Sequence, residues 1–369
     1  MRRLTVVQLL PALHSGGVER STLEIAAALV AAGHRSVVVS AGGRLVAALL
    51  AGGSEHIELP IGAKSLRAFA TMRRLRAQLA ALEPDIVHAR SRLPAWLGWF
   101  ALRGLPAPRP RFVTTVHGLN SPGRYSGILC RGERVVCVSD TVRAHVLRHW
   151  PGTDPAKLQV IPRGIDPAQF PRGHQPDAAW RARFAAEHPA LQGGRLLLLP
   201  GRGTRLKGHA DAIRLLAALR AGGEDARLWL LGAREPGREA YLAELEALAS
   251  SLGVASALAI SEPRSDVLDA YAVADLVLQV SNKPEAFGRT VLEALSVGRP
   301  VLGWAHGGVG ELLGALYPAG AVPVGEHAAL AVAARVLLAA PPPVPVTMPH
   351  TLAAMQSATL DLYARLVSV

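Results

Sequence analysis

The chain has 369 residues, of which half are hydrophobic and 5% aromatic, a globular composition that excludes an intrinsically disordered protein. Its two cysteines, Cys130 and Cys137, exclude a disulfide framework and match no metal-binding spacing. The net charge of +12 is uneven, because residues 1–166 carry 22 Lys and Arg against 10 Asp and Glu, whereas the remainder carries 18 of each. Compositional bias explains why only four basic residues are lysine, but not this imbalance, which indicates an anionic membrane, nucleic acid or phosphorylated substrate.

Short apolar runs alternate with helix-like segments along the whole chain, a pattern that predicts doubly wound parallel sheets of the α/β class. Helices are expected to begin near Glu19, Arg67, Pro94 and Asp140, and a closing helix is expected at 351–366. The strand candidates are residues 4–10, 36–40, 85–89, 111–117, 134–139 and 158–162 in the first half, and 195–201, 226–232, 257–261, 276–281 and 300–304 in the second.

The segment 164–180 is rich in Pro and Gly and predicts a linker between two Rossmann-like domains. We expect an N-terminal domain at 1–168, a C-terminal domain at 169–348, and a helix within 349–369 that packs back toward the first domain. Ligands bind such sheets beyond the carboxyl ends of the strands, so a cleft between facing domains is the expected site. No apolar run is long enough to span a bilayer and the N-terminus lacks a cleavage site, so a cytoplasmic protein is expected.

The stretch 281–311, SNKPEAFGRTVLEALSVGRPVLGWAHGGVGE, places two carboxylates on either side of a glycine turn. Glu285 lies in the loop, and Glu293 lies one turn into a helix that opens after Gly288. Helix N-termini attract phosphate, and carboxylates suit a ligand with many hydroxyl groups. The stretch therefore predicts a sugar-nucleotide site, although Gly and Glu at a strand-turn-helix junction also fit a purely structural role.

Three further loops at strand ends carry candidate binding residues. Gly16 and Gly17 open the first helix, and His117 ends a strand, where its side chain is expected to face a substrate. Arg202 and Lys207 lie in the loop 201–209 and suit a diphosphate leaving group, whose developing charge they would stabilise. A solvated basic loop is the alternative. No Asp-x-Asp or His-carboxylate cluster is placed for a metal, so no metal is expected.

Together these motifs resemble the retaining glycosyltransferases of the GT-B fold grouped as family 4. The matching segments are GGVER (16–20), VHG (116–118), VSD (138–140), VIPRGID (160–166), GRGTRLKG (201–208), LVLQVSNKPEAFGRTVLEAL (276–295) and GRPVLGWAHGGVGELL (298–313). The resemblance implies a nucleotide-sugar donor, with a UDP-sugar expected, bound mainly by the second half without a metal, and a glycan acceptor bound by the first. It implies catalytic roles for His117, Arg202, Lys207 and Glu285. The donor contacts it implies are Gly16, Gly17, Arg202, Lys207, Glu285, Ala286, Phe287, Gly288, Arg289, Thr290 and Glu293.

Several positions depart from the family pattern. Arg163 replaces the usual asparagine, His306 stands where threonine or aspartate is common, and Arg289 replaces an apolar residue, so the sugar is left open. The loop 261–266 lacks the Phe-Gly against which the base often packs, so the base is open too. No carboxylate nucleophile is evident, which favours front-face attack: the leaving phosphate oxygen takes the acceptor's proton as the bond to the sugar forms on the same face.

The basic first half also predicts a membrane partner. An apolar stripe at helical spacing is expected to pack on the sheet while flanking basic residues face an anionic inner-membrane surface. The stripe is Leu66, Phe69, Met72, Leu75, Leu79 and Leu82, and the flanking residues are Lys64, Arg67, Arg73, Arg74 and Arg76. Trp96, Trp99 and Phe100 are expected to anchor at the interface or to pack in the core. By analogy, the acceptor is a lipid-linked or phosphorylated glycan of lipopolysaccharide or polysaccharide biosynthesis.

Three other functions fit parts of these observations. A sugar-nucleotide 2-epimerase of similar fold would act on free UDP-GlcNAc and need no acceptor. A nucleic-acid-binding protein would use the basic half, but the aromatic residues do not interleave with the charges and no binding motif occurs, so no nucleic-acid partner is expected. A sugar-nucleotide sensor would bind without turnover.

Overall fold

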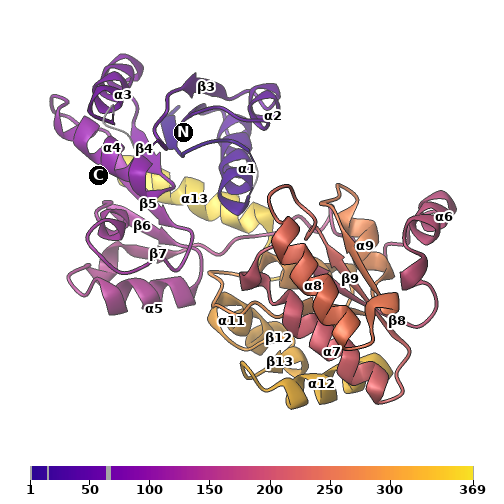
Figure 1. Ribbon diagram of the computed structural model, residues 1–369. Coiled ribbons are helices and arrows are strands. Elements are labelled where there is room, and N and C mark those ends of the chain that lie inside the picture. The colour runs from indigo at the N-terminus through magenta and orange to yellow at the C-terminus, as the bar shows by residue number, and fades with distance from the viewer. Residues whose placement is uncertain (1, 15, 64–67, 369) are drawn as a thin grey trace. The chain divides into compact units, whose positions relative to one another are not determined.

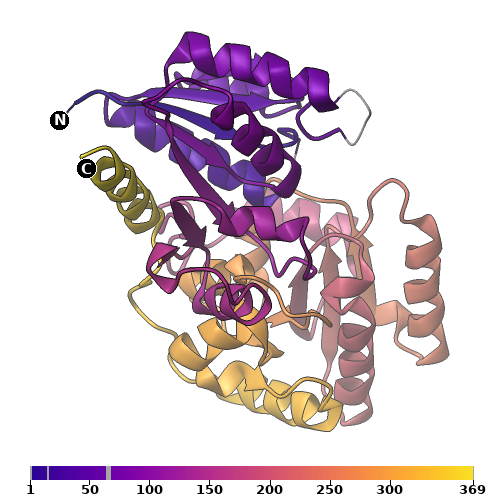
Figure 2. The ribbon, with the colours of Figure 1, turned by 90° about the vertical axis from the view of Figure 1, so that its left-hand side faces the viewer.

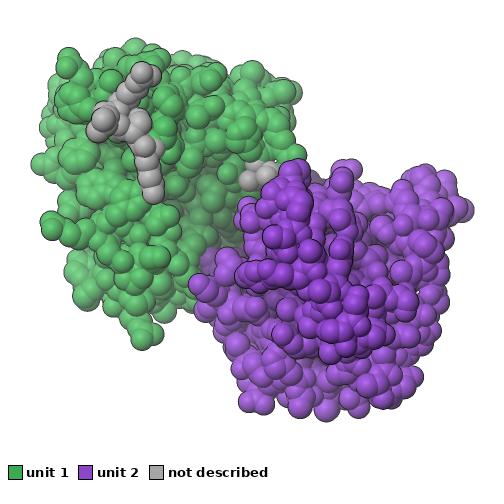
Figure 3. Space-filling model, viewed as in Figure 1, with its two compact units in different colours: residues 1–163, 352–369 green, residues 164–351 purple. Residues whose placement is uncertain are grey.

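The computed structural model describes residues 2–14, 16–63 and 68–368, which divide into two compact units. Unit 1 comprises residues 1–163 and 352–369, and unit 2 comprises residues 164–351 (Figure 3). The boundary thus lies between Arg163 and Gly164, five residues before the expected end of the first domain. The expected linker 164–180 is irregular only as far as Asp177, because a helix begins at Ala178.

Unit 1 is built on a seven-stranded parallel sheet with the strand order β3-β2-β1-β4-β5-β6-β7 (Figure 1). The strands are β1 (Thr5–Leu9), β2 (Arg35–Ser40), β3 (Glu55–Glu58), β4 (Ile86–Ala89), β5 (Arg111–Val116), β6 (Arg134–Cys137) and β7 (Leu158–Val160). The helices are α1 (Gly17–Ala31), α2 (Val46–Ala51), α3 (Ala68–Leu82), α4 (Arg92–Arg103), α5 (Asp140–His149) and α13 (Leu352–Val367). Strand β3 was not predicted, because its sequence EHIE lies at the sheet edge, lacks an apolar run and is only half-buried.

Unit 2 repeats the arrangement with six parallel strands in the order β10-β9-β8-β11-β12-β13. Its strands are β8 (Arg195–Pro200), β9 (Ala226–Leu231), β10 (Leu258–Ser261), β11 (Leu276–Gln279), β12 (Val301–Trp304) and β13 (Ala321–Val322). Its helices are α6 (Ala178–Glu187), α7 (His209–Ala221), α8 (Glu239–Ser251), α9 (Val267–Val273), α10 (Arg289–Val297), α11 (Gly307–Leu316) and α12 (His327–Ala339). The two residues of β13 are too few to give a periodic signal, so this strand was not predicted either.

The strand order determines where ligands can bind. In unit 1 it reverses direction at β1 and β4, and in unit 2 at β8 and β11. The loops that leave neighbouring strands in opposite directions at such a point form a crevice outside the carboxyl ends of the strands. The buried strands read as continuous apolar runs because parallel sheets are covered on both faces, which is why both Rossmann-like sheets could be predicted.

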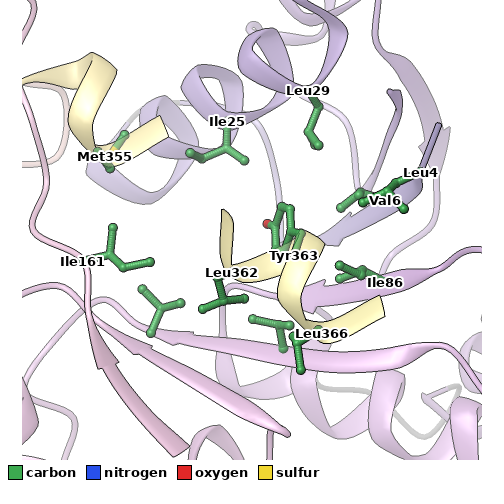
Figure 4. Packing of buried hydrophobic residues seen from close by; sticks show 12 residues of the cluster. Leu4, Val6, Ile25, Leu29, Ile86, Ile161, Met355, Leu362, Tyr363 and Leu366 are labelled. Atoms are coloured by element: carbon green, nitrogen blue, oxygen red, sulfur yellow. The ribbon is translucent and has the colours of Figure 1, made fainter. Parts of the chain in front are cut away.

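Helix α13, yellow in Figures 1 and 2, completes the core of unit 1. Figure 4 shows Leu362 and Tyr363 of this helix lying among Val6 of β1, Ile25 of α1 and Ile86 of β4, in one buried apolar cluster. Burial of a leucine-sized side chain contributes about 1.5–3 kcal/mol. The last helix of the chain therefore packs in the same hydrophobic core as strands β1 and β4.

Helix α3 departs from the predicted apolar stripe. Met72, Leu75 and Leu79 are buried as expected, whereas Phe69 is 66% exposed. At 3.6 residues per turn, Phe69 lies roughly 120° around the helix from the buried Leu75. The stripe residue Leu66 and the flanking Lys64 and Arg67 lie outside the described residues. None of the helices in the described ranges is long and apolar enough to cross a membrane.

Candidate functional sites in the two units

An ion pair lies at the switch point of unit 2. Lys207, from the loop after β8, places its Nζ 2.7 Å from Oε1 of Glu285, in the loop after β11. The Ser281 hydroxyl donates a further hydrogen bond to the same carboxylate. Burial raises the pKa of Glu285, but the Lys207 charge and these hydrogen bonds outweigh it, so the pKa is lower than usual. The carboxylate is therefore ionised at neutral pH, and both partners remain about one-quarter exposed.

Glycines hold the loop of Lys207 close to neighbouring backbone. Gly208 has a φ of +73°, and a Cβ atom there would lie 1.8 Å from the Val280 carbonyl oxygen. At Gly203 a Cβ would lie 2.1 Å from the Ala233 oxygen. No side chain fits at such distances, so these positions require glycine. The lysine emerges from this loop just before α7, and Arg202, on the same loop, is exposed.

The second expected carboxylate lies in the second turn of α10. Gly288, with a φ of +105°, precedes the helix. Glu293 is 8% exposed and accepts a hydrogen bond from the Tyr271 hydroxyl at 2.9 Å. Arg289, one turn earlier, places Nε 3.5 Å from the other carboxylate oxygen. Glu293 is thus a buried, oriented carboxylate whose partner Tyr271 comes from α9.

The loop 282–288 packs backbone to backbone against the start of α11. The Gly308 amide donates to the Glu285 carbonyl oxygen at 2.7 Å. A Cβ at Gly307 would lie 2.6 Å from that oxygen, and one at Gly308 would lie 2.5 Å from the Cα of Phe287, so both glycines permit the contact. Because α7, α10 and α11 all begin at this edge of the sheet, their N-termini favour an anionic ligand there.

Unit 2 contains three polar residues that sequence reasoning missed. Ser281 is the last residue of the expected strand 276–281, four residues before Glu285, a position from which it could have been proposed. Tyr271 has no local signal, because only the packing of α9 against α10 brings it to Glu293. His209 is fully buried, and burial followed by the Lys207 charge lowers its pKa to about 4. The expected residues Ala286 and Thr290 are half-buried, and the Phe287 ring is buried near His350.

In unit 1, the expected residues His117 and Gly17 are joined by Arg163. One Arg163 nitrogen, Nη2, lies 2.8 Å from Nδ1 of His117, and Nη1 donates to the Gly17 carbonyl oxygen at 2.5 Å. Gly16, with a φ of +138°, precedes α1. Burial, followed by the charges of Arg163 and Arg90, holds the pKa of His117 well below its usual range. In the sequence Arg163 appeared only as a departure from the family pattern.

A second buried polar cluster lies beside it and was not predicted. His88 contacts the Tyr363 hydroxyl through Nδ1 and the Thr115 hydroxyl through Nε2, both at 2.6 Å. Arg90 donates from Nε to Oε1 of Gln8 at 2.6 Å. His88, Arg90, Thr115, His117 and Arg163 all line a cavity of about 20 Å³, roughly the space of one water molecule. The sequence HAR at a strand end was the available signal.

No group of three or more His, Cys, Asp and Glu side chains is placed to hold a metal ion anywhere in the described part of the chain. The two units offer different chemistry. The unit 2 site combines a lysine, two carboxylates and helix N-termini, which suits a ligand that carries both phosphate and hydroxyl groups. The unit 1 cluster offers buried hydrogen-bond donors.

Two family models match consecutive parts of the chain. The model of Glycosyltransferase Family 4 matches residues 15–169, and that of Glycosyl transferases group 1 matches residues 181–345. The chain is 30% identical over 243 residues to the D-inositol 3-phosphate glycosyltransferase of Xylanimonas cellulosilytica, covering 61% of this chain and 56% of the relative. It is 30% identical over 182 residues to the lipopolysaccharide glucosyltransferase WaaG of Escherichia coli, covering 48% and 46%. The chain thus spans little more than half the length of the first of these relatives.

Solved structures share the fold over nearly the whole chain. A glycosyltransferase from Rickettsia africae superposes with a TM-score of 0.83 at 25% identity, covering 100% of this chain and 99% of that one. HepE of Anabaena, solved in complex with UDP-glucose, has a TM-score of 0.79 at 18% identity, covering 98% and 100%. The expected GT-B fold is confirmed by these likenesses and by the two parallel sheets. The chain belongs to the family 4, group 1 glycosyltransferases.

Proposed function

We propose that this chain is a metal-independent glycosyltransferase that moves a sugar from a nucleotide diphosphate sugar to a glycan acceptor with retention of configuration. The observation that carries the proposal is the Lys207–Glu285 pair at the switch point of unit 2, surrounded by helix N-termini. The family and the glycosyltransferase relatives support it. Unit 2 binds the donor, and unit 1 binds the acceptor.

The donor's charged and hydroxyl groups match the residues of unit 2. Lys207 and Arg202 hold the diphosphate, helped by amides at the starts of α10 and α11. Glu285, ionised at neutral pH, accepts hydrogen bonds from hydroxyl groups of the transferred sugar. Glu293 accepts from the ribose hydroxyl groups. A UDP-sugar is the proposed donor, a choice supported by the UDP-glucose complex of HepE.

The transfer step follows from these contacts. The bond between the anomeric carbon and the diphosphate oxygen breaks, and the acceptor oxygen bonds to the same face of the sugar. The acceptor proton passes to the departing phosphate oxygen, so no side chain needs to gain or lose a proton. Glu285 is held by Lys207 and Ser281, which suits a binding role better than nucleophilic attack. Lys207 stabilises the negative charge that develops on the leaving group.

The proposed acceptor is a lipid-linked or phosphorylated glycan, reached at an anionic membrane surface on the cytoplasmic side. Unit 1 exposes Phe69 on α3 and Phe100 on α4 at 66% and 47%, and these two helices pack together. The Phe100 ring lies 4.9 Å from the Trp99 ring, over which the Arg103 guanidinium lies at 4.6 Å. Exposed aromatic and basic side chains on paired helices suit the headgroup region of a bilayer. The similarity to WaaG, a lipopolysaccharide glucosyltransferase, supports the acceptor class.

The deciding experiment measures nucleoside diphosphate release from UDP-, GDP-, ADP- and dTDP-sugars in EDTA, for wild type and Lys207→Ala. We expect one productive donor, and a fall in kcat of about 10²–10³-fold in the variant with donor binding largely kept. The matched control is Arg205→Ala, an exposed residue of the same loop paired with Glu244. Unchanged turnover in Lys207→Ala would rule out the leaving-group role.

The same samples discriminate the alternatives. NMR of the product should show the donor's anomeric configuration, and inversion would contradict front-face attack. A 2-epimerase would convert UDP-GlcNAc without an acceptor, and a sensor would bind a donor without releasing diphosphate. Sedimentation with vesicles containing anionic lipid tests the membrane surface, and binding should weaken in Phe69→Ser and Phe100→Ser.

A further inference from the structure

The contact between Arg163 and His117 constrains the imidazole. A guanidinium group carries only donors, and it remains protonated in proteins. Because Arg163 Nη2 lies 2.8 Å from Nδ1 of His117, Nδ1 must accept the hydrogen bond and cannot hold a proton. In a neutral ring the single proton then lies on Nε2. The contact therefore selects one of the two neutral tautomers.

We propose that Arg163 is a positioning residue that fixes His117 as the neutral, Nε2-protonated tautomer, so that His117 serves as a hydrogen-bond donor to substrate and not as an acid or base. The tautomer follows from the geometry of unit 1 alone. The donor role toward substrate rests on the proposed function.

The surroundings of Nε2 indicate what it binds. Nε2 is buried and has no hydrogen-bond partner among the described residues, and the same holds for Nη2 of Arg90. Both residues line the same cavity, and no carboxylate is among its described lining residues. Buried donors without partners are rare because they cost free energy, and these two would be satisfied by an oxygen that accepts hydrogen bonds. Because the cavity of about 20 Å³ has room for a single oxygen atom, the matching group is a water molecule or a hydroxyl or carbonyl oxygen of the substrate, and a protonated amine is disfavoured.

The charges around His117 keep the ring neutral. Arg163 faces it after β7, and His88 and Arg90 face it from β4 and the residue that follows. From α1 and α13, Glu24 and Tyr363 interact with Arg90. Burial and the facing cations all oppose protonation of His117, and its pKa lies well below the usual range. Arg163 thus supplies both the hydrogen bond that selects the tautomer and part of the field that prevents titration.

Three substitutions separate these two contributions. Arg163→Met removes the donor and the charge, Arg163→Gln keeps a donor without the charge, and Arg163→Lys keeps both. The readout is the ¹⁵N spectrum of the imidazole groups in the full-length protein labelled at histidine, from pH 8 to pH 5, with His117 assigned by its loss in His117→Gln. Arg35→Met, which removes an arginine paired with Glu55 at the far edge of the sheet, is the control.

We expect a wild-type His117 that carries its proton on Nε2 and whose pKa lies well below the ordinary value of 6.5. Arg163→Met should mix the tautomers and raise the pKa of His117. Arg163→Gln should also raise the pKa and should no longer impose one tautomer, because its amide can either donate to Nδ1 or accept from it. Arg163→Lys, which has only donors, should keep both wild-type properties. An Nδ1-protonated ring, a wild-type pKa near 6.5, or an unchanged spectrum in Arg163→Met would each overturn the proposal. If Arg163→Met does not fold, the wild-type tautomer and the spectrum of Arg163→Lys still decide it.

Kinetics test the consequence for catalysis. In wild type, kcat/KM should show no acid limb due to His117 near its ordinary pKa of 6.5. In Arg163→Met it should fall about tenfold, the scale of one hydrogen bond to a charged group, and gain an acid limb. A protein without transferase activity that still shows the Nε2 tautomer would refute the proposed function and leave the tautomer assignment intact.

Discussion

In unit 2, the loops after β8 and β11 place a lysine 2.7 Å from a glutamate. In unit 1, at the corresponding ends of β1 and β4, Arg90 instead donates a hydrogen bond to the neutral amide of Gln8. The overall charge differs in the same way. Unit 1 carries 23 Lys and Arg against 10 Asp and Glu, and unit 2 carries 17 against 18. The two units therefore share a strand order but differ in the charged groups that lie at its switch point.

The difference has a chemical consequence for ligand binding. In unit 2 each charge of the Lys207–Glu285 pair is already compensated, so a ligand with both phosphate and hydroxyl groups can replace the pair and satisfy both residues. In unit 1, Nη2 of Arg90 and Nε2 of His117 have no hydrogen-bond acceptor among the described residues. The unit 2 site therefore suits a nucleotide sugar, which carries both phosphate and hydroxyl groups. The unit 1 site suits an oxygen atom of a substrate.

The largest expected effect concerns the glycines of the two sites. Gly208→Ala should destabilise unit 2 by about 3 kcal/mol or more, because the methyl group would clash with the Val280 backbone at a positive φ. Gly223→Ala, also at positive φ but with nothing within 4 Å, should cost about 1 kcal/mol. In unit 1, Gly17→Ala meets only the movable end of Arg163, at 2.6 Å, and should cost about 1 kcal/mol or less. Urea unfolding measures the free energy of unfolding of all three variants. Equal losses of stability in Gly208→Ala and Gly223→Ala would contradict the inference that the backbone near Gly208 leaves no room for a side chain.

The pH dependence of stability should be of similar size. His209 has a folded pKa of about 4 against an ordinary value of 6.5, so between these values only the unfolded chain gains the proton. Stability of unit 2 should therefore fall by about 3 kcal/mol as the pH drops from 6.5 to 4. In unit 1, burial lowers the pKa of His88 and His117 and gives the same direction.

Further acid should continue to weaken unit 2. Hydrogen bonds from Arg264 lower the pKa of Asp266 to about 2, so the stability it contributes above its ordinary value of 3.8 is lost as the pH falls toward 2. Hydrogen-exchange protection of β8 in unit 2 and β4 in unit 1, converted to free energies at each pH, follows the two units separately. His209→Gln should reduce the pH dependence of stability in unit 2 alone. A reduced pH dependence in unit 1 as well would show that the units do not respond independently.

A smaller effect is expected from Tyr363, which links α13 to His88 of β4 within unit 1. Tyr363→Phe leaves Nδ1 of His88 without its partner in a buried site and should cost about 1–3 kcal/mol. The matched change in unit 2 is Tyr317→Phe, because Tyr317 is equally buried but donates only to the Pro342 carbonyl at 3.2 Å. It should cost about 0.5–1.5 kcal/mol. Thermal unfolding ranks the two, and the reverse order would argue against a tighter hydrogen-bond network in unit 1.

The smallest effect concerns donor binding. Glu293→Gln keeps the shape of the side chain and removes its charge, so donor affinity should fall about tenfold, equal to 1.4 kcal/mol. Glu246→Gln on the surface of unit 2 is the control and should leave the affinity unchanged. Calorimetric titration with the responding nucleotide sugar gives both values. An unchanged affinity in Glu293→Gln would remove this carboxylate from the proposed ribose contacts.

Local pattern was enough to predict most of the fold. Apolar runs such as LLLLP and LVLQ become β8 and β11 because strands of a covered parallel sheet are buried on both faces. The pattern failed at the half-buried edge strand β3 and at Phe69, where a hydrophobic residue lies off the buried face of its helix. The glycine turns before α1, α7 and α10 could also be predicted from the sequence, because a helix that starts close to a strand end needs backbone angles that glycine permits.

The sequence by itself determined the fold class, the two parallel sheets, the loops at the strand ends and the identity of Lys207, Glu285 and His117 as candidates. Only the tertiary structure decided their partners. Lys207 meets Glu285 across 78 positions, and His88 meets Tyr363 across 275. Periodicity reports which face of an element is buried, but the order of strands in a sheet decides which loops become neighbours. For that reason the sequence showed Arg163 only as a departure from the family pattern. The fold shows that it donates a hydrogen bond to His117.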